Sequence, residues 1–178
     1  MTFSATKFGK KFTAGVQMQR PGLLLLDGKI FAAFASHCDF DVYYGWIFKI
    51  DAHSGQINDV FLTTGNTSAF GAGIWQSGTG LSSDQSGRLF ANVGNAFYAP
   101  KYNTSMPGNK PPQVLTESAF KLNTSMTPMT AQDFFMPTNE QYLDSLDLDM
   151  GTSGKAHAKV HHLATGHAAM TNTWLQVW

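Results

Sequence analysis

The sequence predicts an all-β protein: a partial β-propeller of about two four-stranded antiparallel blades plus the start of a third, followed by a non-repeat C-terminal tail. Three observations lead to this fold class. Two stretches of chain repeat the same order of apolar runs, Gly- and Pro-containing turns bound those runs, and no apolar helical period crosses the region. Charged residues make up only 13%, about half the usual share, so Ser, Thr, Asn and Gly must supply the polar surface.

The first half of the repeat contains a turn followed by a long apolar strand. GLLLLDGKIFAAFAS at 22–36 and GLSSDQSGRLFANVG at 80–94 both begin Gly-Leu and turn at a glycine. A basic residue follows in each copy, and then Ile-Phe-Ala or Leu-Phe-Ala begins the strand. Shared turn chemistry and shared order favour a duplicated unit over two unrelated hairpins.

The second half of the repeat supplies two further strands. WIFKIDAHSG at 46–55 matches SAFKLNTSMT at 118–127, and DVFLTT at 59–64 matches DFFMPT at 133–138. Each copy therefore contains four strands, which is the content of one propeller blade. We expect strands at 22–26, 29–36, 45–51 and 57–63 in the first copy, and at 74–82, 88–94, 117–122 and 131–136 in the second.

The domain organisation follows from the repeat. A third copy begins with LDLDMGTSG at 146–154, which matches AGIWQSGTG at 72–80, and the strand pattern does not continue beyond it. We therefore expect a fragment of a longer propeller. A β-sandwich is the alternative, but it gives no reason for shared turns. The predicted parts are a lead-in at 1–16, blades at 17–154 (blade one 17–64, blade two 72–138, the start of blade three 146–154) and a divergent His- and Ala-rich tail at 155–178.

Composition excludes several classes of function. Twelve basic and twelve acidic residues cancel, so no net field favours nucleic acid. No run approaches the roughly 20 apolar residues of a membrane span, and the N-terminus lacks a signal-peptide pattern. Cys38 is the sole cysteine and cannot form an internal disulfide. Three Asn-Thr-Ser sequons, at Asn66, Asn103 and Asn123, would suit a glycoprotein in a secreted or extracytoplasmic compartment.

One end of the predicted blades carries the long connections. Alternating strand direction places the second-to-third and blade-to-blade connections together, and these are long: 37–44, 64–73, 95–116 and 137–146. The turns at the other end are mostly short. Because long loops on a rigid scaffold usually carry the binding residues, we expect the functional face at the long-loop end.

Candidate ligand-binding residues lie where the innermost strands would reach the central channel. An arginine, an aromatic residue, an amide and two aspartates could hold a polar, planar ligand together with a cation at the channel mouth. In the alternative interpretation the aromatic residue packs between blades and the aspartates cap turns. The candidates are Arg20, Trp75, Gln76, Asp147 and Asp149.

The segment His-Cys-Asp-Phe-Asp at 37–41 invites a metal interpretation through His37 and Asp39. No histidine or cysteine recurs at the matching place in the second copy, so a structural loop with a capping aspartate is favoured. Cys38 lacks a base on its own side of the strand, and we assign no catalytic residue. In the tail, His157 and His161 have helical i, i+4 spacing, which predicts adventitious metal affinity at most.

Three segments together resemble the pyrroloquinoline-quinone-like (PQQ-like, quinoprotein-type) repeat proteins: QRPGLLLLDGKIFAAFASHCDFDVYYGW, GIWQSGTGLSSDQSGRLFANVGN and LDLDMGTSG. The resemblance covers about residues 17–154. It implies a closed propeller of about seven or eight blades, often extracytoplasmic. Quinoprotein dehydrogenases of this fold bind PQQ and calcium in the channel and oxidise alcohols or sugars. No residue here matches their calcium ligands or catalytic aspartate, and Cys38 alone cannot form the vicinal disulfide of some relatives.

These observations predict a propeller fragment without catalysis of its own, serving as a scaffold or binding module. One alternative is a part of a quinone-dependent alcohol or sugar oxidoreductase, for which PQQ and calcium follow from the resemblance alone. The other is a carbohydrate- or protein-binding propeller that uses Tyr43, Tyr44, Trp46 and Trp75. The expected partners are the remaining blades or a second copy, together with a small-molecule or glycan ligand. Bare blade faces predict self-association.

Overall fold

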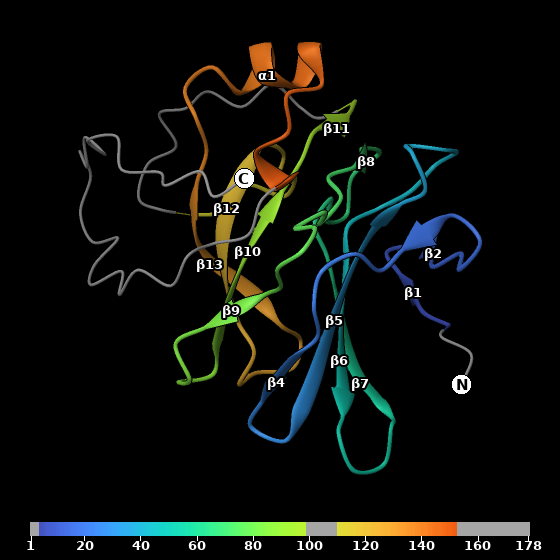
Figure 1. Cartoon of the computed structure of the whole chain (residues 1–178), viewed down its shortest axis with the longest axis vertical. Helices are drawn as coiled ribbons and strands as arrows, with labels where there is room; N and C mark the ends of the chain where they lie inside the picture. Colours follow the sequence, from blue (N-terminus) through green and yellow to red (C-terminus); the bar gives the residue numbers. More distant parts are fainter. Residues whose placement is uncertain (1–3, 99–109, 153–178) are drawn as a thin grey trace.

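The computed structural model describes residues 4–98 and 110–152, and these form an all-β fold with two main antiparallel sheets (Figure 1). Sheet one contains β3 (Gln17–Met18), β4 (Leu24–Leu26), β5 (Lys29–Ser36), β6 (Trp46–Asp51) and β7 (Ile57–Leu62). Sheet two contains β9 (Ser82–Ser83), β10 (Arg88–Val93), β12 (Ser118–Asn123) and β13 (Thr130–Phe135). The predicted all-β class is confirmed, and both sheets are open.

Short elements complete the described chain. β1 (Thr6–Lys7) pairs with β2 (Lys10–Lys11), and β8 (Phe70–Gly71) pairs with β11 (Ala96–Phe97). The helix α1 (Glu140–Leu146) and the 3-10 turn η1 (Met150–Thr152) follow sheet two. None of these was predicted from the sequence, because each is too short to show a period. No helix within the described ranges is long and apolar enough to cross a membrane.

Most predicted strands lie within about a residue of their observed bounds, but the innermost ones differ. The expected strand at 74–82 runs as extended chain and turns, and only Ser82–Ser83 pairs with β10. The expected strand at 22–26 is a bridge at Gly22 followed by β4. The tight turn between β4 and β5 uses Asp27 and Gly28, both with positive φ, which a two-residue hairpin of this hand requires.

The two sheets have the same internal register. In sheet one Phe31 pairs with Lys49, which pairs with Asp59, and a bulge follows between Lys49 and Ile50. In sheet two Phe90 pairs with Lys121, which pairs with Asp133, and a bulge follows between Lys121 and Leu122. The matches drawn between 46–55 and 118–127, and between 59–64 and 133–138, therefore correspond to equivalent places in three dimensions.

Alternation along the strands gives each sheet two distinct faces. Face A carries two phenylalanines with a lysine and an aspartate between them. These are Phe31, Lys49, Asp59 and Phe61 in sheet one, and Phe90, Lys121, Asp133 and Phe135 at the equivalent places in sheet two. Face B is apolar. It carries Ile30, Ala32, Phe34, Phe48, Ile50 and Val60 in sheet one, and Leu89, Ala91, Val93, Phe120, Leu122 and Phe134 in sheet two.

Sheet one packs its face A against face B of sheet two, which forms the largest core of the described chain. Phe31, Ala33, Ile47 and Phe61 share one cluster with Leu89, Ala91, Val93, Phe120 and Leu122. The Phe61 and Phe120 rings stack across the junction with centroids 5.7 Å apart. Face A of the first copy therefore meets face B of the second, so unlike faces are in contact. We call this relation between the two copies head to tail.

The N-terminal segment covers face B of sheet one. Phe12 lies edge-on to Phe34 and Phe48, with both ring-centroid distances at 4.9 Å. Lys10 fixes this segment through Nζ, which donates to Thr64 Oγ1 at 2.7 Å and to the Ala69 carbonyl oxygen at 2.9 Å. The prediction of two bare blade faces is therefore wrong for this face, because residues 5–12 fill it.

The segment after α1 lies against the end of sheet two. Residues 72–76, which begin the second copy, lie against sheet one at the equivalent place. η1 contacts β10 and β12, and the backbone amide of Gln76 donates to the Gly151 carbonyl oxygen at 2.8 Å. At the preceding junction the Gly22 amide donates to the Thr79 carbonyl oxygen at 2.5 Å. At both junctions a backbone amide of one innermost segment therefore donates to a carbonyl oxygen of the next, although at different positions along the segments. The predicted tail at 155–178, with His157 and His161, lies outside the described residues.

Candidate functional site at the loop-rich end

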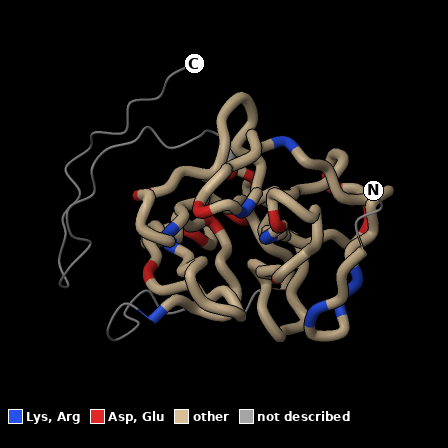
Figure 2. The backbone as a smooth tube through the Cα atoms, turned by 90° about the horizontal axis from the view of Figure 1, so that it is seen from below, with Lys and Arg blue, Asp and Glu red and all other residues tan. Residues whose placement is uncertain are grey.

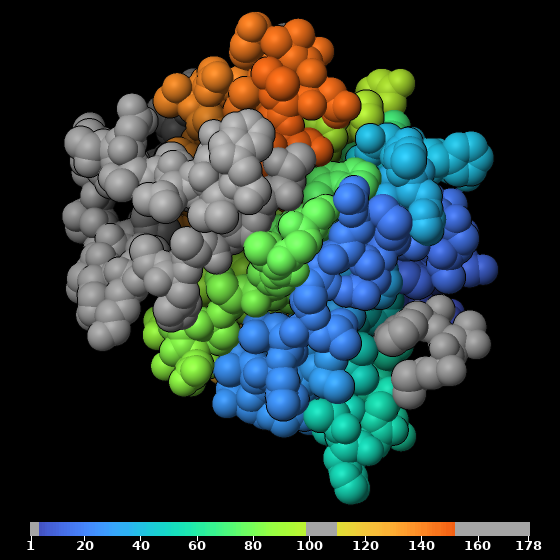
Figure 3. Space-filling model, in the orientation of Figure 1, coloured from blue at the N-terminus to red at the C-terminus, as the bar shows by residue number. Residues whose placement is uncertain are grey.

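Long connections gather at one end of the molecule, uppermost in Figure 1, where α1, β8 and β11 lie near the β5–β6 loop. We call this the loop-rich end and define it as residues 37–44, 64–73, 94–98 and 137–149. The same segments border one another on the surface in Figure 3. Among the described residues, this is the end that the sequence predicted to carry function.

Arg20 and Trp75 do come together. The Arg20 guanidinium carbon lies 5.8 Å from the centre of the Trp75 ring system, and Trp75 meets Tyr43 edge-on at 6.1 Å. The Tyr43 hydroxyl donates to Asp39, and burial together with this contact raises the pKa of Tyr43 far above its ordinary value. Trp75 is buried, so only Arg20 and the edge of this stack face solvent.

Gln76 is not available to a ligand. It is fully buried. Its Nε2 donates to the Gly80 carbonyl oxygen at 3.1 Å, and its Oε1 accepts from the backbone amide of Asn92 at 3.2 Å. The amide therefore ties the innermost segment of the second copy to β10. The prediction of a ligand contact at Gln76 does not match this placement, because backbone groups use both ends of its side chain.

Asp147 and Asp149 both hold Asn95. Asp147 Oδ1 accepts from Asn95 Nδ2 at 2.9 Å, and Asp149 Oδ1 accepts from the Asn95 backbone amide at 2.9 Å. These bonds fasten the segment after α1 to the end of β10. Asp149 therefore caps a backbone amide and Asp147 holds a side-chain amide, while Trp75 is buried.

Glu117 is an acidic residue that the sequence analysis missed. Its side chain is completely buried beside the start of β12, and Oε2 accepts from the Met150 amide at 2.7 Å. Burial, with the neighbouring Asp149 and Asp144 carboxylates, raises the pKa of Glu117 to about 8. Burial also raises the pKa of Asp149. Nothing in the run Thr-Glu-Ser-Ala-Phe marks this glutamate, since its environment is built by residues 144–150.

The Glu117 and Asp149 carboxyl groups are neighbours, and each changes the pKa of the other. Because burial raises the pKa of Glu117 to about 8, the Glu117 carboxyl holds a proton at neutral pH. Asp144 lies nearby and accepts from Thr116 Oγ1 at 2.7 Å. Chemically, the cluster can store a proton and hold the segment 144–150 in place, because one oxygen of each of Glu117, Asp144 and Asp149 accepts a hydrogen bond from the chain itself.

His37 and Asp39 do not converge on a common point. His37 is exposed, and Asp39 accepts from the Tyr43 hydroxyl. Cys38, Asp39 and Asp41 all have positive φ, which shapes this loop as a series of turns. Within residues 4–98 and 110–152, no three His, Cys, Asp or Glu side chains are arranged to hold a metal ion.

The aromatic residues predicted to bind ligands are mostly interior. Tyr43, Trp46 and Trp75 are buried, and half-buried Tyr44 lies under the Lys10 ammonium at 4.7 Å. Other aromatic residues are exposed at this end instead: Phe40, Phe97, Tyr98 and Tyr142. Phe70 supports two of them, with ring centroids 4.8 Å from Phe97 and 5.7 Å from Tyr98.

The sequons and the charged residues are distributed over both halves of the molecule. Asn66 is exposed, Asn123 is half-buried with Oδ1 accepting from the Ser125 amide, and Asn103 lies outside the described residues. Lys and Arg lie beside Asp and Glu in both halves (Figure 2).

No family model, no curated protein and no solved structure matches the chain.

Proposed function

We propose that this chain is a repeat module of a β-propeller of the PQQ-like type and that it has no catalysis of its own. In this proposal sheets one and two are neighbouring blades, and residues 147–152 begin the next one. The head-to-tail packing of two sheets with the same register carries the proposal.

A sandwich also packs two sheets face to face, so packing alone would not favour blades. A two-fold pair of copies would bring like faces together, as isologous interfaces do. Here face A meets face B, and a heterologous relation of this kind repeats around an axis or along a line. Repeat proteins use this relation between neighbouring units.

The innermost segments support an axis beside them. Gly22 and Gly80 form an isolated parallel bridge. A Cβ atom added at Gly80 would lie 2.9 Å from the Gly22 carbonyl oxygen, so only glycine fits there. Backbones crowd in this way where the first strands of adjacent blades converge.

The absence of catalysis in the proposal rests on how the polar groups are used. Gln76, Asp147 and Glu117 bond to amides of the chain, and Asp39 bonds to Tyr43. A quinoprotein needs carboxylate and amide oxygens directed at calcium and quinone. Among the candidates predicted from the sequence, Arg20 holds its charged group at the surface, over an aromatic ring.

Two measurements test the proposal. In nuclear magnetic resonance spectra we expect contacts between the ring protons of Phe61 and Phe120, and none between Phe48 and Phe120, because Phe48 lies on the other face of sheet one. Contacts between Phe48 and Phe120 would mean that like faces meet and would remove the blade assignment.

For catalysis, titration with PQQ and calcium followed by dye-linked alcohol oxidation should give no turnover, and measurable turnover would refute a non-catalytic module.

The exposed aromatic residues favour a second function, carbohydrate binding at the loop-rich end. Tyr98 is 81% exposed and Phe40 69%, and rings with acidic and amide neighbours suit sugar faces and hydroxyl groups. A glycan array with the full chain tests this, with Tyr98→Ala as the variant and Leu25→Ala, 68% exposed in β4, as the matched control. Binding that Tyr98→Ala abolishes and Leu25→Ala keeps supports it, and a blank array removes it while leaving the scaffold role untouched.

A further inference from the structure

Backbone pairing joins three segments of the loop-rich end into one support. Tyr44 pairs with Gly71 in a parallel bridge, and Gly71 pairs with Ala96 where β8 meets β11. The Gly71 amide donates to the Tyr43 carbonyl oxygen at 2.8 Å. The loop before β6, β8 and β11 therefore hold one another in place through main-chain bonds.

The segment after α1 is fastened to the same support through Asn95, the residue before β11. Asp147 accepts from the Asn95 side chain and Asp149 from its backbone amide, both at 2.9 Å. In Figure 3 the orange surface of α1 borders the yellow-green end of β11. Side chains on this end therefore have fixed positions, which lowers the entropy cost of binding a partner.

Large apolar side chains are exposed at this end more often than elsewhere. Seven of the twelve that are exposed in the described chain belong to it. Tyr98, Phe40 and Tyr142 are each more than half exposed, and the other four are Val42, Phe97, Leu146 and Leu148. Exposed aromatic and aliphatic side chains gathered on one surface are typical of sites that bind another protein.

The charged residues of the loop-rich end are all acidic, and its ranges contain no lysine or arginine. Three of its carboxylates are exposed, and each accepts from an uncharged donor, either a tyrosine hydroxyl or an amide. These are Asp39, Asp41 and Asp147. This end therefore has an excess of negative charge, although the chain as a whole is neutral.

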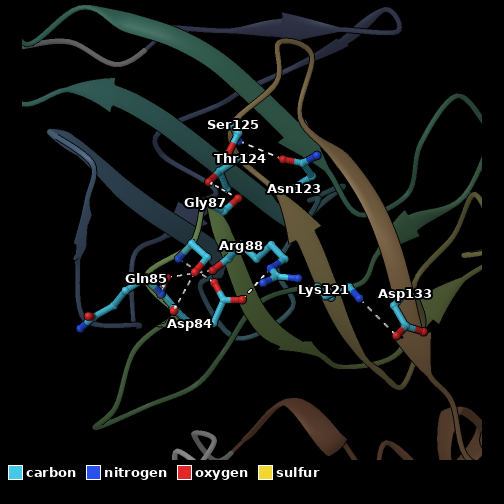
Figure 4. A network of polar contacts seen from close by, with 11 residues as sticks. Asp84, Gln85, Gly87, Arg88, Lys121, Asn123, Thr124, Ser125 and Asp133 are labelled. Carbon is cyan, nitrogen blue, oxygen red and sulfur yellow. Dashed lines mark hydrogen bonds and ion pairs between the residues drawn. The ribbon is translucent and has the colours of Figure 1, made fainter. Parts of the chain in front are cut away.

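Two aspartates in the short turns at the opposite end have basic partners instead. Asp51 lies 2.5 Å from Lys29 Nζ, and Asp84 lies 2.5 Å from Arg88 Nε, the second contact being drawn in Figure 4. Among the described residues, no lysine or arginine forms such a pair with the three exposed carboxylates of the loop-rich end. Their charge is therefore open to a partner.

Two basic residues lie beside the loop-rich end but bond to other groups. Lys10 is buried, and its ammonium donates to Thr64 Oγ1 and to the Ala69 carbonyl oxygen. The Arg20 guanidinium lies over the ring system of Trp75.

Carboxylates from different loops lie close enough to act on one another. Burial raises the pKa of Asp149, and the charges of Asp147 and Asp39 raise it further. Like charges gathered in this way repel, and a cation supplied from outside would relieve the repulsion. The exposed rings would add to that attraction, because aromatic faces bind ammonium and guanidinium groups.

We propose that the loop-rich end is a docking surface for a basic polypeptide segment of a partner protein. Lysine or arginine side chains of that segment would pair with Asp39, Asp41 and Asp147, and its apolar side chains would pack on Phe97 and Tyr98. This partner goes beyond the scaffold role, and the inference does not depend on sheets one and two being blades.

The charge of the surface selects this occupant. A neutral glycan would use the same rings but would leave the three exposed carboxylates without a cation. A nucleic acid or an acidic glycan would be repelled by them. A basic polypeptide satisfies both the rings and the carboxylates.

The experiment measures binding of two labelled synthetic peptides to the full chain by fluorescence anisotropy. One peptide alternates lysine, leucine and serine, and the other has glutamate at every lysine position. The carboxylate variant combines Asp41→Asn with Asp147→Asn, because an amide oxygen can still accept the hydrogen bonds that these carboxylates accept. Its control is Asp27→Asn, at an exposed carboxylate in the turn between β4 and β5. Tyr98→Ala is the ring variant, with Leu25→Ala as its control.

We expect the lysine peptide to bind at least about tenfold more tightly than the glutamate peptide, and its affinity to fall as salt is raised. The double variant and Tyr98→Ala should each weaken binding of the lysine peptide at least about fivefold. Asp27→Asn and Leu25→Ala should each change it less than about twofold. Urea midpoints close to that of the unaltered chain should accompany these losses, because the changed side chains are exposed.

Equal affinity for the two peptides, or no binding of the lysine peptide, would overturn the inference. So would equal losses in Asp27→Asn and in the double variant, since overall charge rather than this surface would then attract the peptide. Tighter binding of the neutral sugar cellohexaose than of the lysine peptide would also overturn it, in favour of a glycan on the rings. The proposed blade relation would survive each of these results, because the contact between Phe61 and Phe120 tests it independently.

Discussion

Lys49 and Thr124 join the two sheets: the buried Lys49 ammonium donates to the Thr124 carbonyl oxygen at 2.6 Å. A lysine inside a junction is costly unless its hydrogen bonds are met, so its position fixes how the sheets can stack. The lysine reaches the turn between β12 and β13 only if face A of sheet one meets face B of sheet two. This polar contact therefore selects the head-to-tail arrangement, whereas the apolar residues around it supply most of the burial.

Lys49→Met should lower the free energy of unfolding by about 1–3 kcal/mol, because it leaves a buried carbonyl oxygen without its donor while keeping the apolar stem. Urea unfolding followed by tryptophan fluorescence measures the change. Lys11→Met is the control, since Lys11 is exposed on β2 and should change stability by less than about 0.5 kcal/mol. Equal losses for both variants would contradict a role for Lys49 at the junction.

Phe12→Ala should cost about 3–5 kcal/mol and uncover face B of sheet one, because the ring packs on Phe34 and Phe48. An uncovered apolar sheet face favours association with other copies. We expect concentration-dependent oligomers in sedimentation velocity, which Phe8→Ala, a change at a ring that is 52% exposed, should not produce. A variant that stays as monomeric and stable as the unaltered chain would show that residues 5–12 do not cap the sheet.

The raised pKa of Glu117 predicts a fall in stability as the pH rises from about 4.5 to about 8. Glu117 ionises near 4.5 in the unfolded chain and at about 8 in the folded one, so the folded chain holds an extra proton between these values. Its contribution to stability is complete below pH 4.5 and is lost as pH rises through about 8, with a slope of at most about 1.4 kcal/mol per pH unit.

Glu117→Gln should flatten this pH dependence, since the amide oxygen can still accept from the Met150 amide and carries no charge. Urea midpoints measured from pH 4 to pH 9 in about six steps test the prediction. Asp41→Asn, at an exposed carboxylate of the same end, is the control and should follow the unaltered chain. A decline of the same slope between pH 4.5 and about 8 in the Glu117→Gln variant and in the unaltered chain would falsify the assignment of the buried proton to Glu117.

Gly45→Ala should disrupt the junction between β6 and the loop at 64–73. A Cβ atom at Gly45 would lie 2.0 Å from the Ala72 carbonyl oxygen and 2.5 Å from Thr63 Oγ1, so backbone must move. We expect a loss of about 3 kcal/mol or more in stability by chemical denaturation. Gly15→Ala is the matched control, because a Cβ there meets nothing within 4 Å, and it should be tolerated. If Gly45→Ala were also tolerated, the close approach of these segments would be wrong.

The repeat could be predicted from the sequence because it depends on residues that are close together along the chain. Glycine turns, alternating apolar runs and the recurring Phe-Lys and Asp-x-Phe patterns need no knowledge of distant contacts. The candidate site could be predicted only in part. Arg20 and Trp75 were found together, but Trp75 and Gln76 lie inside, and the exposed rings Phe40 and Tyr98 were not singled out. Exposure depends on neighbours that are far away along the chain.

By itself the sequence determined that this chain is β-structured, that it contains two copies of a four-stranded unit, and which end carries the long loops. Tertiary structure alone decided which face of one copy meets which face of the other, that Phe12 covers one exposed sheet, and that Glu117 lies beside Asp149. The physical reason is that strand pairing follows periods readable within a few residues. Stacking and pKa depend on burial against segments as much as 75 residues apart, as for Lys49 and Thr124.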